Sequence, residues 1–214
     1  FKKKFAAEGL EYIAMTEVGF IYAMSTRPIA TFADLKNSKN WSPSGDPVSE
    51  AYLSTLGISP VQLSIPDVLT SLQSGLIETA YNSFYGSIVL QWFTKARYIA
   101  DIPYGYAYGV FALDGKKFAT LPESHKKVIA EAAEHHFPIL LQKTRQSNRE
   151  SRQVLEKRGC QFLPIDKETR QILQEKSVQT VKLLIPGSMS KDIYEQTIEL
   201  RNTFRATTGA ESTN

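Results

Sequence analysis

The chain has 214 residues, of which 42% are hydrophobic and 22% are charged, and both fractions are ordinary for a folded globular protein. The net charge is +3, and only Lys2-Lys3-Lys4 forms a basic run. Nucleic-acid binding needs clustered Lys and Arg to neutralise phosphates, so it is not expected. No window approaches the roughly 18 consecutive apolar residues of a membrane helix. The single cysteine, Cys160, excludes an internal disulfide and is expected to be a buried, unreactive thiol.

The first residues predict the last turn of a helix, a stop at Gly9 and then a strand. The chain is therefore expected to begin in mid-fold, after a region that is absent from this sequence or a signal peptide that has been removed.

Short runs rich in Val, Ile, Tyr and Phe, bounded by Gly, Pro or Asn, predict strands. They cover residues 12–15, 20–24, 61–64, 77–81, 98–102, 107–113 and 161–163. Between them, helix starts are indicated by capping residues: Thr31, Asp46, Ser64 and Thr120. Behind Ser64, apolar residues at helical spacing predict one buried face, with Gly75 as the stop. The alternation of strand and helix predicts an α/β fold with mainly parallel sheets.

Residues 120–158 have helical propensity throughout. A continuous helix of that length would extend nearly 60 Å at about 1.5 Å per residue, which exceeds the diameter of a small domain. Such a helix is expected to lean on more than one body, and Pro138 is expected to bend or break it. Two further helices are expected after Asp166 and Ser190, followed by a disordered tail over 208–214.

Enzyme signatures are missing from the sequence. Adjacent side chains such as His135 and His136 point about 100° apart on a helix and do not share a metal in the usual way. There is no Gly-rich phosphate loop, no nucleophile elbow and no Cys/His cluster. No catalytic residue, metal or cofactor is therefore predicted.

Several segments, in order and spacing, resemble the solute receptors of TRAP transporters, the dicarboxylate-receptor or DctP-type family. They are Arg27-Pro-Ile29, Asp34-Leu-Lys36, Leu56-Gly57 with Pro60, Asp67-Val68, Leu72-Gln73, Gly75, Ile77-Glu78 and Asn82. Further on, "KKFATLPESHKKVIAEAAEHH" resembles the opening of the family's long helix. The similarity extends from about residue 8 to residue 205.

The resemblance implies a two-lobed, periplasmic-binding-protein-like fold with hinge strands, one long helix along both lobes, and roughly the first third of the fold upstream of Phe1. Residues 1–26 would complete the N-terminal lobe and a crossing strand, and 27–105 would form the ligand-binding C-terminal lobe. Residues 106–207 would return to the N-terminal lobe, and 208–214 would be the tail.

The implied function is that of an extracytoplasmic, periplasmic receptor, not an enzyme. It would capture a small organic, carboxylate-bearing molecule in an interlobe cleft and deliver it to the membrane subunits of a TRAP-type secondary transporter. Two alternatives stay open: an enzyme on a related α/β scaffold, and the effector-binding lobe of a regulator. A clustered acid/base pair would favour the first, and an upstream DNA-binding segment the second.

In the family, an arginine follows the "DLK" segment and pairs with the ligand carboxylate. Here the corresponding position is Trp41, which offers a flat ring face and one indole donor. Trp41 is therefore predicted to select the ligand by stacking or by attraction of a cation, or else to be a residue of the lobe core.

Asn82 ends a predicted strand where the family places a ligand-contacting asparagine, although it could equally cap the following helix. Tyr81, Tyr85 and Ile65 lie near family cleft positions and complete the predicted ligand-binding set. Tyr104, Tyr106 and Tyr108 alternate along a strand and either direct hydroxyls into the cleft or pack on the sheet.

Overall fold

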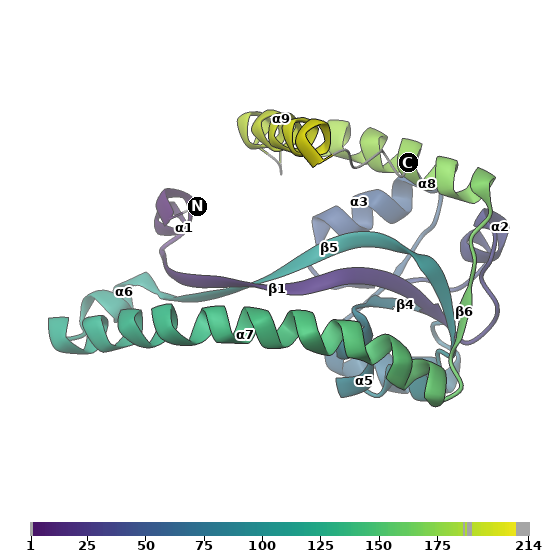
Figure 1. Cartoon of the computed structure of the whole chain (residues 1–214), viewed down its shortest axis with the longest axis horizontal. Helices are drawn as coiled ribbons and strands as arrows, with labels where there is room; N and C mark the ends of the chain where they lie inside the picture. The colour runs from purple at the N-terminus through teal and green to yellow at the C-terminus, as the bar shows by residue number, and fades with distance from the viewer. Residues whose placement is uncertain (1, 186, 188–189, 209–214) are drawn as a thin grey trace. The chain divides into compact units, whose positions relative to one another are not determined.

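The computed structural model describes residues 2–185, 187 and 190–208 (Figure 1). The strands are β1 (Leu10–Ser25), β2 (Trp41–Pro43), β3 (Val61–Leu63), β4 (Thr79–Asn82), β5 (Tyr98–Asp114) and β6 (Gln161–Leu163). The helices are α1 (Lys2–Ala7), α2 (Phe32–Lys36), α3 (Pro47–Thr55), α4 (Val68–Ser74), α5 (Phe84–Val89), α6 (Gly115–Ala119), α7 (Glu123–Lys157), α8 (Lys167–Leu184) and α9 (Lys191–Thr208). Short 3₁₀ turns cover Ile65–Asp67 and Trp92–Thr94.

The chain divides into two compact units. Unit 1 comprises residues 1–22, 82–91 and 103–160, and unit 2 comprises residues 23–81, 92–102 and 161–214. Both long strands contribute to both units, because the boundaries 22/23 and 102/103 fall inside β1 and β5. The four segments expected from the sequence stay a prediction. In the structure, α8 groups with unit 2 because it packs on α3 and α2.

In unit 1, β1 and β5 run antiparallel. The amide of Gly115 donates to the carbonyl of Gly9, and Phe20 meets Tyr106 edge to face. Residue numbers therefore rise along β1 as they fall along β5, which is the antiparallel arrangement. Each long strand had been predicted as two short ones, 12–15 with 20–24 and 98–102 with 107–113. Those predictions were wrong about the interruption: Gly19 lies inside β1 with φ 111°, and strand β5 continues through Gly105.

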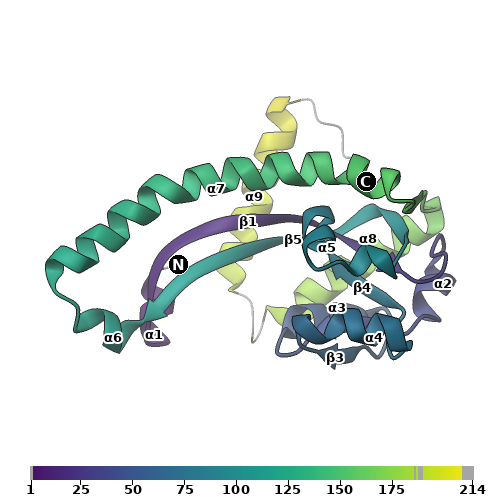
Figure 2. The ribbon, with the colours of Figure 1, turned by 90° about the horizontal axis from the view of Figure 1, so that it is seen from below.

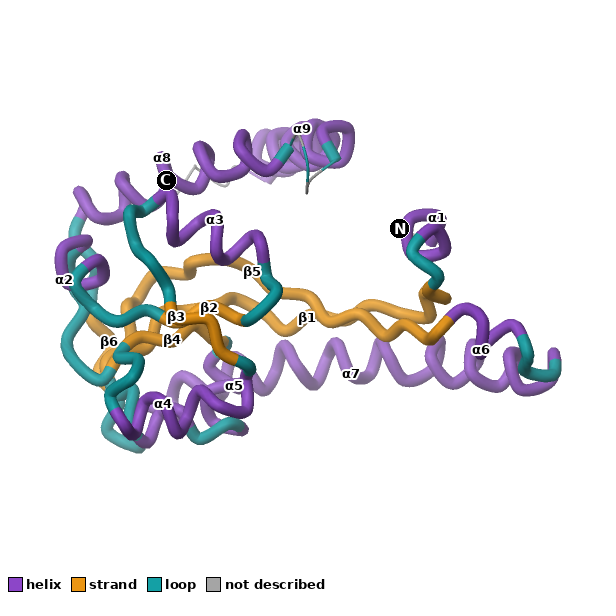
Figure 3. Tube along the Cα trace, turned by 180° about the vertical axis from the view of Figure 1, so that it is seen from behind, coloured by secondary structure: helices purple, strands orange, loops and turns teal. Residues whose placement is uncertain are grey.

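Unit 2 contains the parallel pairing that the sequence predicted. Strand β2 pairs in parallel with β3, with Trp41 opposite Val61, and Asn40 forms a parallel bridge to Thr79 of β4. Strand β6 pairs in parallel with β5 at its Tyr98 end. The larger sheet has the order β4-β1-β5-β6. The result is a mixed α/β fold, in which the antiparallel β1–β5 pair was not anticipated. Figure 3 shows these strands in orange.

The helix boundaries follow local capping chemistry. Thr31 forms a reciprocal capping box with Asp34 at the start of α2, and Asp46 accepts from two backbone amides at the start of α3. Gly75 ends α4 in the left-handed conformation, which glycine adopts without steric cost. Ser64 occupies the N-cap of the 3₁₀ turn that leads into α4, as predicted, but its hydroxyl bonds the Asp67 carboxylate and no backbone amide. One predicted cap was wrong, because Pro122, not Thr120, occupies the N-cap of α7.

Helix α7 is a single helix of 35 residues with Pro138 inside it, so the proline does not break it. In Figure 2 the helix follows a gentle curve along its length. Losing one backbone donor to a proline is compatible with a curved, exposed helix. All of α7 belongs to unit 1. The final helix ends at Thr208, and the rest of the predicted tail lies outside the described residues.

Most of the deeply buried side chains lie in unit 2. They include Met24, Ile29, Leu35, Val68, Ile77, Trp92 and Ile99. Unit 1 buries fewer, among them Leu155 and Cys160, whose side chain is buried as expected and forms no disulfide. Within the described part of the chain, no helix combines the length and apolar character that crossing a bilayer requires.

Ile77 and its neighbour Leu76 provide a matched test of this core. Ile77 is fully buried, whereas Leu76 is 51% exposed. Ile77→Ala should lower the free energy of unfolding by about 2–5 kcal/mol because it leaves a cavity. Leu76→Ala should change it by about 0.5 kcal/mol or less. Urea denaturation of both variants measures the difference, and an equal or larger cost for Leu76→Ala would contradict the assigned packing.

Candidate functional site

Two of the sequence-predicted residues lie near the carboxyl edge of the parallel strands of unit 2. Strand β3 ends at Leu63, and Ile65 follows it with a side chain that is 48% exposed. Tyr81 lies in β4, and its hydroxyl donates to the side-chain oxygen of Asn40 at 2.6 Å. The carboxyl edge of parallel strands is where α/β sheets usually bind ligands. Ile65 therefore offers accessible apolar surface, and Tyr81 is held in place by a hydrogen bond.

Trp41 is buried in unit 2, at the first residue of β2 and two positions before the strand ends at Pro43. Its indole N–H donates to the carbonyl of Leu63 at 3.0 Å. Its ring meets the buried ring of Trp92 edge to face, with centroids 5.3 Å apart. The donor and one ring edge are therefore already engaged inside the unit. That Trp41 contacts a ligand stays a prediction.

The other two predicted residues, Asn82 and Tyr85, belong to unit 1. The side-chain oxygen of Asn82 accepts from the amide of Ser83 at 2.8 Å. A Cβ at Gly86 would lie 2.3 Å from that same oxygen, so glycine is required where α5 passes Asn82. Ser83, not Asn82, supplies the N-cap of α5. Asn82 is thus held in one orientation, and the Tyr85 side chain next to it is 44% exposed.

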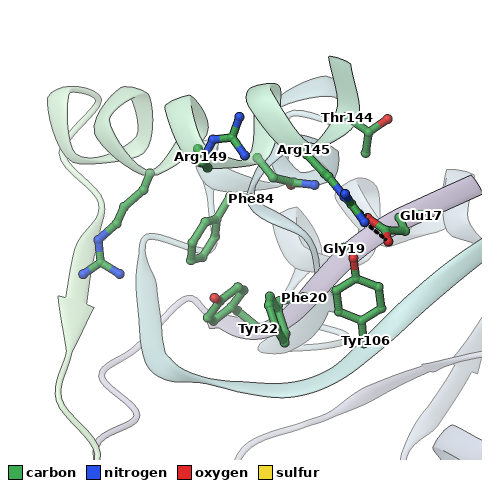
Figure 4. Close-up of a pocket in the computed structure, with 11 residues that line it drawn as sticks. Glu17, Gly19, Phe20, Tyr22, Phe84, Tyr106, Thr144, Arg145 and Arg149 are labelled. Atoms are coloured by element: carbon green, nitrogen blue, oxygen red, sulfur yellow. Dashed lines mark hydrogen bonds and ion pairs between the residues drawn. The ribbon is translucent and has the colours of Figure 1, made fainter. Parts of the chain in front are cut away.

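A cavity of about 420 Å³ lies inside unit 1 and has none of the five predicted residues in its wall. It is bounded by β1, β5, α5 and α7, and Figure 4 shows the side chains that line it. The lining residues are Glu17, Gly19, Phe20, Tyr22, Phe84, Tyr106, Thr144, Arg145, Asn148, Arg149 and Arg152.

An ion pair forms part of the wall of this cavity. Arg145 of α7 binds the Glu17 carboxylate of β1 through two hydrogen bonds of 2.6 Å each. This bond, with a further one from Tyr106, holds the pKa of Glu17 below its ordinary value. Desolvation, reinforced by the neighbouring Glu17, raises the pKa of Tyr106 to about 12. The phenol is therefore a permanent neutral donor, and the pair fixes α7 against β1.

Asn148 connects three elements of the same unit. Its side-chain amide donates to the carbonyl of Val18 in β1 at 2.8 Å, and its oxygen accepts from the amide of Tyr85 in α5 at 3.3 Å. A Cβ at Gly19 would come within 2.6 Å of the Asn148 nitrogen. The close approach of α7 to β1 therefore depends on glycine at this position.

Sequence reasoning missed these cavity residues, apart from naming Tyr106 among three strand tyrosines. Two signals were available. Gly19 interrupts a strand-like run, which often marks a bulge or a close backbone approach. Arg145, Asn148, Arg149 and Arg152 repeat at helical spacing, which places them on one face of α7. Within the described ranges, no cluster of three or more His, Cys, Asp or Glu side chains could hold a metal ion.

Comparison with known families shows which protein family this chain belongs to. The model of the bacterial extracellular solute-binding protein family 7, DctP, matches residues 1–185. The chain belongs to this family. The resemblance drawn from the short segments is thereby confirmed.

Solved structures of TRAP periplasmic solute-binding proteins share the fold of this DctP-family chain. One from Haemophilus influenzae with bound L-gulonate gives a TM-score of 0.84 at 16% identity, covering 92% of this chain and 65% of its own. One from Desulfovibrio salexigens with bound orotic acid gives 0.80 at 20% identity, covering 96% and 66%. The ectoine-binding protein of the TeaABC TRAP transporter of Halomonas elongata gives 0.79 at 20% identity, covering 98% and 66%. This chain spans less than two thirds of the length of each.

Gly19→Ala tests the contact between Asn148 and β1, with Gly45→Ala as the control. Both glycines have positive φ, but nothing lies within 4 Å of a Cβ at Gly45. Gly45→Ala should lower the free energy of unfolding by the backbone strain alone, about 1 kcal/mol. Gly19→Ala should lower the free energy of unfolding by clearly more, because the new Cβ displaces Asn148. Since Asn148 accepts from the Tyr85 amide, hydrogen exchange at that amide should become faster. Equal costs, with exchange unchanged, would show that the Asn148 contact does not constrain the strand.

Glu17→Gln tests the ion pair through pH. Because the folded state lowers the pKa of Glu17, the pair contributes stability above the ordinary glutamate pKa and loses it as pH falls through the lowered value. The parent chain should therefore melt a few degrees higher than Glu17→Gln at pH 7. The gap should close below about pH 4 and narrow in high salt. A gap that is constant from pH 7 to pH 3 would contradict this electrostatic origin.

Proposed function

We propose that the complete protein is an extracytoplasmic solute receptor of a TRAP-type secondary transporter and that it binds its solute without chemical change. The observation that supports this most strongly is the match of the solute-binding family model to residues 1–185. The mixed α/β fold agrees with receptor structures along nearly the whole chain. Delivery to separate membrane subunits and a periplasmic location follow from that membership as parts of the same proposal.

The solute we propose is a small organic acid. Similar receptors contain bound galacturonate, orotic acid, galactonate or gulonate, and others bind pyroglutamic acid or ectoine. All of these are compact polar molecules bearing a carboxylate. The aligned arginine that would pair with such a group is Trp41 in this chain, so the carboxylate must be held by other donors.

Among the predicted residues, we assign direct contact to Asn82, Tyr85 and Ile65. The amide nitrogen of Asn82 is a donor that a ligand oxygen can accept from, because the oxygen of the same side chain is already bonded to Ser83. Tyr85 and Ile65 each offer partly exposed surface. Tyr81 and Trp41 are engaged within unit 2 by their hydrogen bonds to Asn40 and Leu63, and we assign them the role of positioning residues in that unit.

The two alternatives have weaker support. An enzyme would need a clustered acid/base pair. The carboxylate that lines the cavity of unit 1, Glu17, is paired with Arg145 and so does not serve as a free acid or base. A regulator lobe would need a DNA-binding segment elsewhere in the gene product. The family match favours the receptor over both.

A thermal-shift screen on the full-length protein tests the proposal. Galacturonate, orotate, pyroglutamate, ectoine and related acids should include at least one that raises the melting temperature by several degrees, since a ligand at 100 times its Kd stabilises by about 2.7 kcal/mol. Stabilisation by none of the organic acids, while a nucleotide or a DNA duplex does stabilise, would contradict a receptor.

Asn82→Ala should then reduce the affinity for that acid by about tenfold or more, because a buried polar contact loses its partner. Trp41→Phe keeps the packing against Trp92 but removes the indole donor, which bonds the carbonyl of Leu63. The affinity for the acid should therefore change by less than about threefold, the effect of losing one neutral hydrogen bond within the protein. Asn202→Ala, on α9, serves as the control. Isothermal titration of the three variants gives the comparison, and undiminished affinity in Asn82→Ala would remove Asn82 from the site.

A further inference from the structure

The cavity of unit 1 is a partly open pocket that none of the residues of the proposed solute site lines. Its volume of about 420 Å³ lies within the range of small-molecule pockets in proteins, about 300–1,000 Å³. None of Trp41, Ile65, Tyr81, Asn82 or Tyr85 lines it. Its position is fixed by the Glu17–Arg145 pair and by Asn148, which ties α7 to β1 and α5.

Two aromatic pairs form the apolar walls. Tyr22 and Phe84 stack with centroids 3.9 Å apart and planes 18° apart. Phe20 and Tyr106 meet edge to face at 4.8 Å. Figure 4 shows these four rings gathered below the helix that carries Arg145 and Arg149. Aromatic walls of this kind favour a flat, apolar ligand body, which stacks or packs edge-on against them.

The charged side chains of the lining are predominantly basic. Three arginines and one glutamate face the cavity, and the glutamate neutralises Arg145. Arg152 shares its charge with Glu156, which does not line the cavity. Arg149, among the described residues, makes no hydrogen bond or ion pair with a carboxylate. An unpaired guanidinium beside aromatic rings is a bidentate receptor for a carboxylate.

We propose that this cavity is a second ligand site, which binds a small aromatic carboxylate: the ring lies between the Tyr22/Phe84 and Phe20/Tyr106 pairs, and the carboxylate pairs with Arg149. The site goes beyond the proposed solute function and is independent of Asn82. Its walls include β1 and β5, the strands that run through both units, so an occupant would stabilise the segments of these strands in unit 1.

The test is a ¹⁹F NMR titration of the full-length protein with 4-fluorobenzoate, followed by line broadening of the probe. Both tryptophans belong to unit 2, so a probe-detected signal is preferable to intrinsic fluorescence. Arg149→Gln should weaken binding about tenfold or more, the usual loss when a charge-assisted pair is removed. Phe20→Ala should weaken it as well, and the fold should survive because Phe20 is 53% exposed.

Two controls separate this site from nonspecific attraction and from the solute site. Lys143→Gln removes the same charge from α7 at a residue that does not line the cavity, and it should leave binding unchanged. Asn82→Ala should also leave it unchanged, and neutral 4-fluorobenzamide should bind at least about tenfold more weakly than the acid.

Equal binding by the parent chain and Arg149→Gln would overturn the proposal, as would equal losses in Arg149→Gln and Lys143→Gln. A loss in Asn82→Ala with Arg149→Gln unaffected would place the probe in the solute site and would likewise reject the second site. If only the solute proposal fails, two results should appear together. No organic acid of the thermal-shift screen would stabilise the protein, while 4-fluorobenzoate would still bind and Arg149→Gln would still weaken that binding.

Discussion

The antiparallel pairing of β1 with β5 is the constraint on which the other features depend. These two strands are the longest in the described chain, and each runs through both units. In unit 1 two helices are anchored to β1: α7 through the Glu17–Arg145 pair and Asn148, and α5 through the stacking of Tyr22 on Phe84. In unit 2 the same strands continue into the sheet that carries β4 and β6.

Asn82, which we propose as a solute contact, is held in place by several groups of the scaffold. The side chain of Asn82 is oriented by the Ser83 amide, and its space is secured by the missing Cβ of Gly86. Helix α5, which begins directly after it, is held by Asn148 through the amide of Tyr85. Because these groups are fixed before a ligand arrives, little ordering entropy remains to be lost on binding. Preorganisation of this kind suits a receptor that binds and releases its solute without chemistry.

Local signals in the sequence predicted what depends on neighbouring residues. The capping box at Thr31, the cap at Asp46 and the left-handed stop at Gly75 are all decided within a few positions, and the structure confirms them. The predicted gaps between strands at residues 16–19 and 103–106 were wrong, because pairing along the whole β1–β5 ladder outweighs the local propensity for a turn. Pro138 was predicted to bend or break α7; the helix is continuous and curved, and Phe137 next to the proline stacks on Phe111 of β5.

The candidate site was predictable only in part. Asn82 and Ile65 could be named from the family resemblance, and the structure places Asn82 at the last residue of β4 and Ile65 two residues after β3. The burial of Trp41 against Trp92 could not be foreseen, since it depends on two segments that meet only in the fold. The cavity residues are brought together from β1, β5, α5 and α7, and no short motif encodes that meeting.

Native mass spectrometry of the full-length protein, purified under gentle conditions and then titrated with the cell's own small-molecule extract, tests the central claim most directly. A solute receptor should appear as a 1:1 complex with a low-mass organic acid, displaced by excess of the same acid and diminished in Asn82→Ala. A spectrum of bare protein throughout, with turnover of a compound in the extract, would contradict it and would identify an enzyme instead.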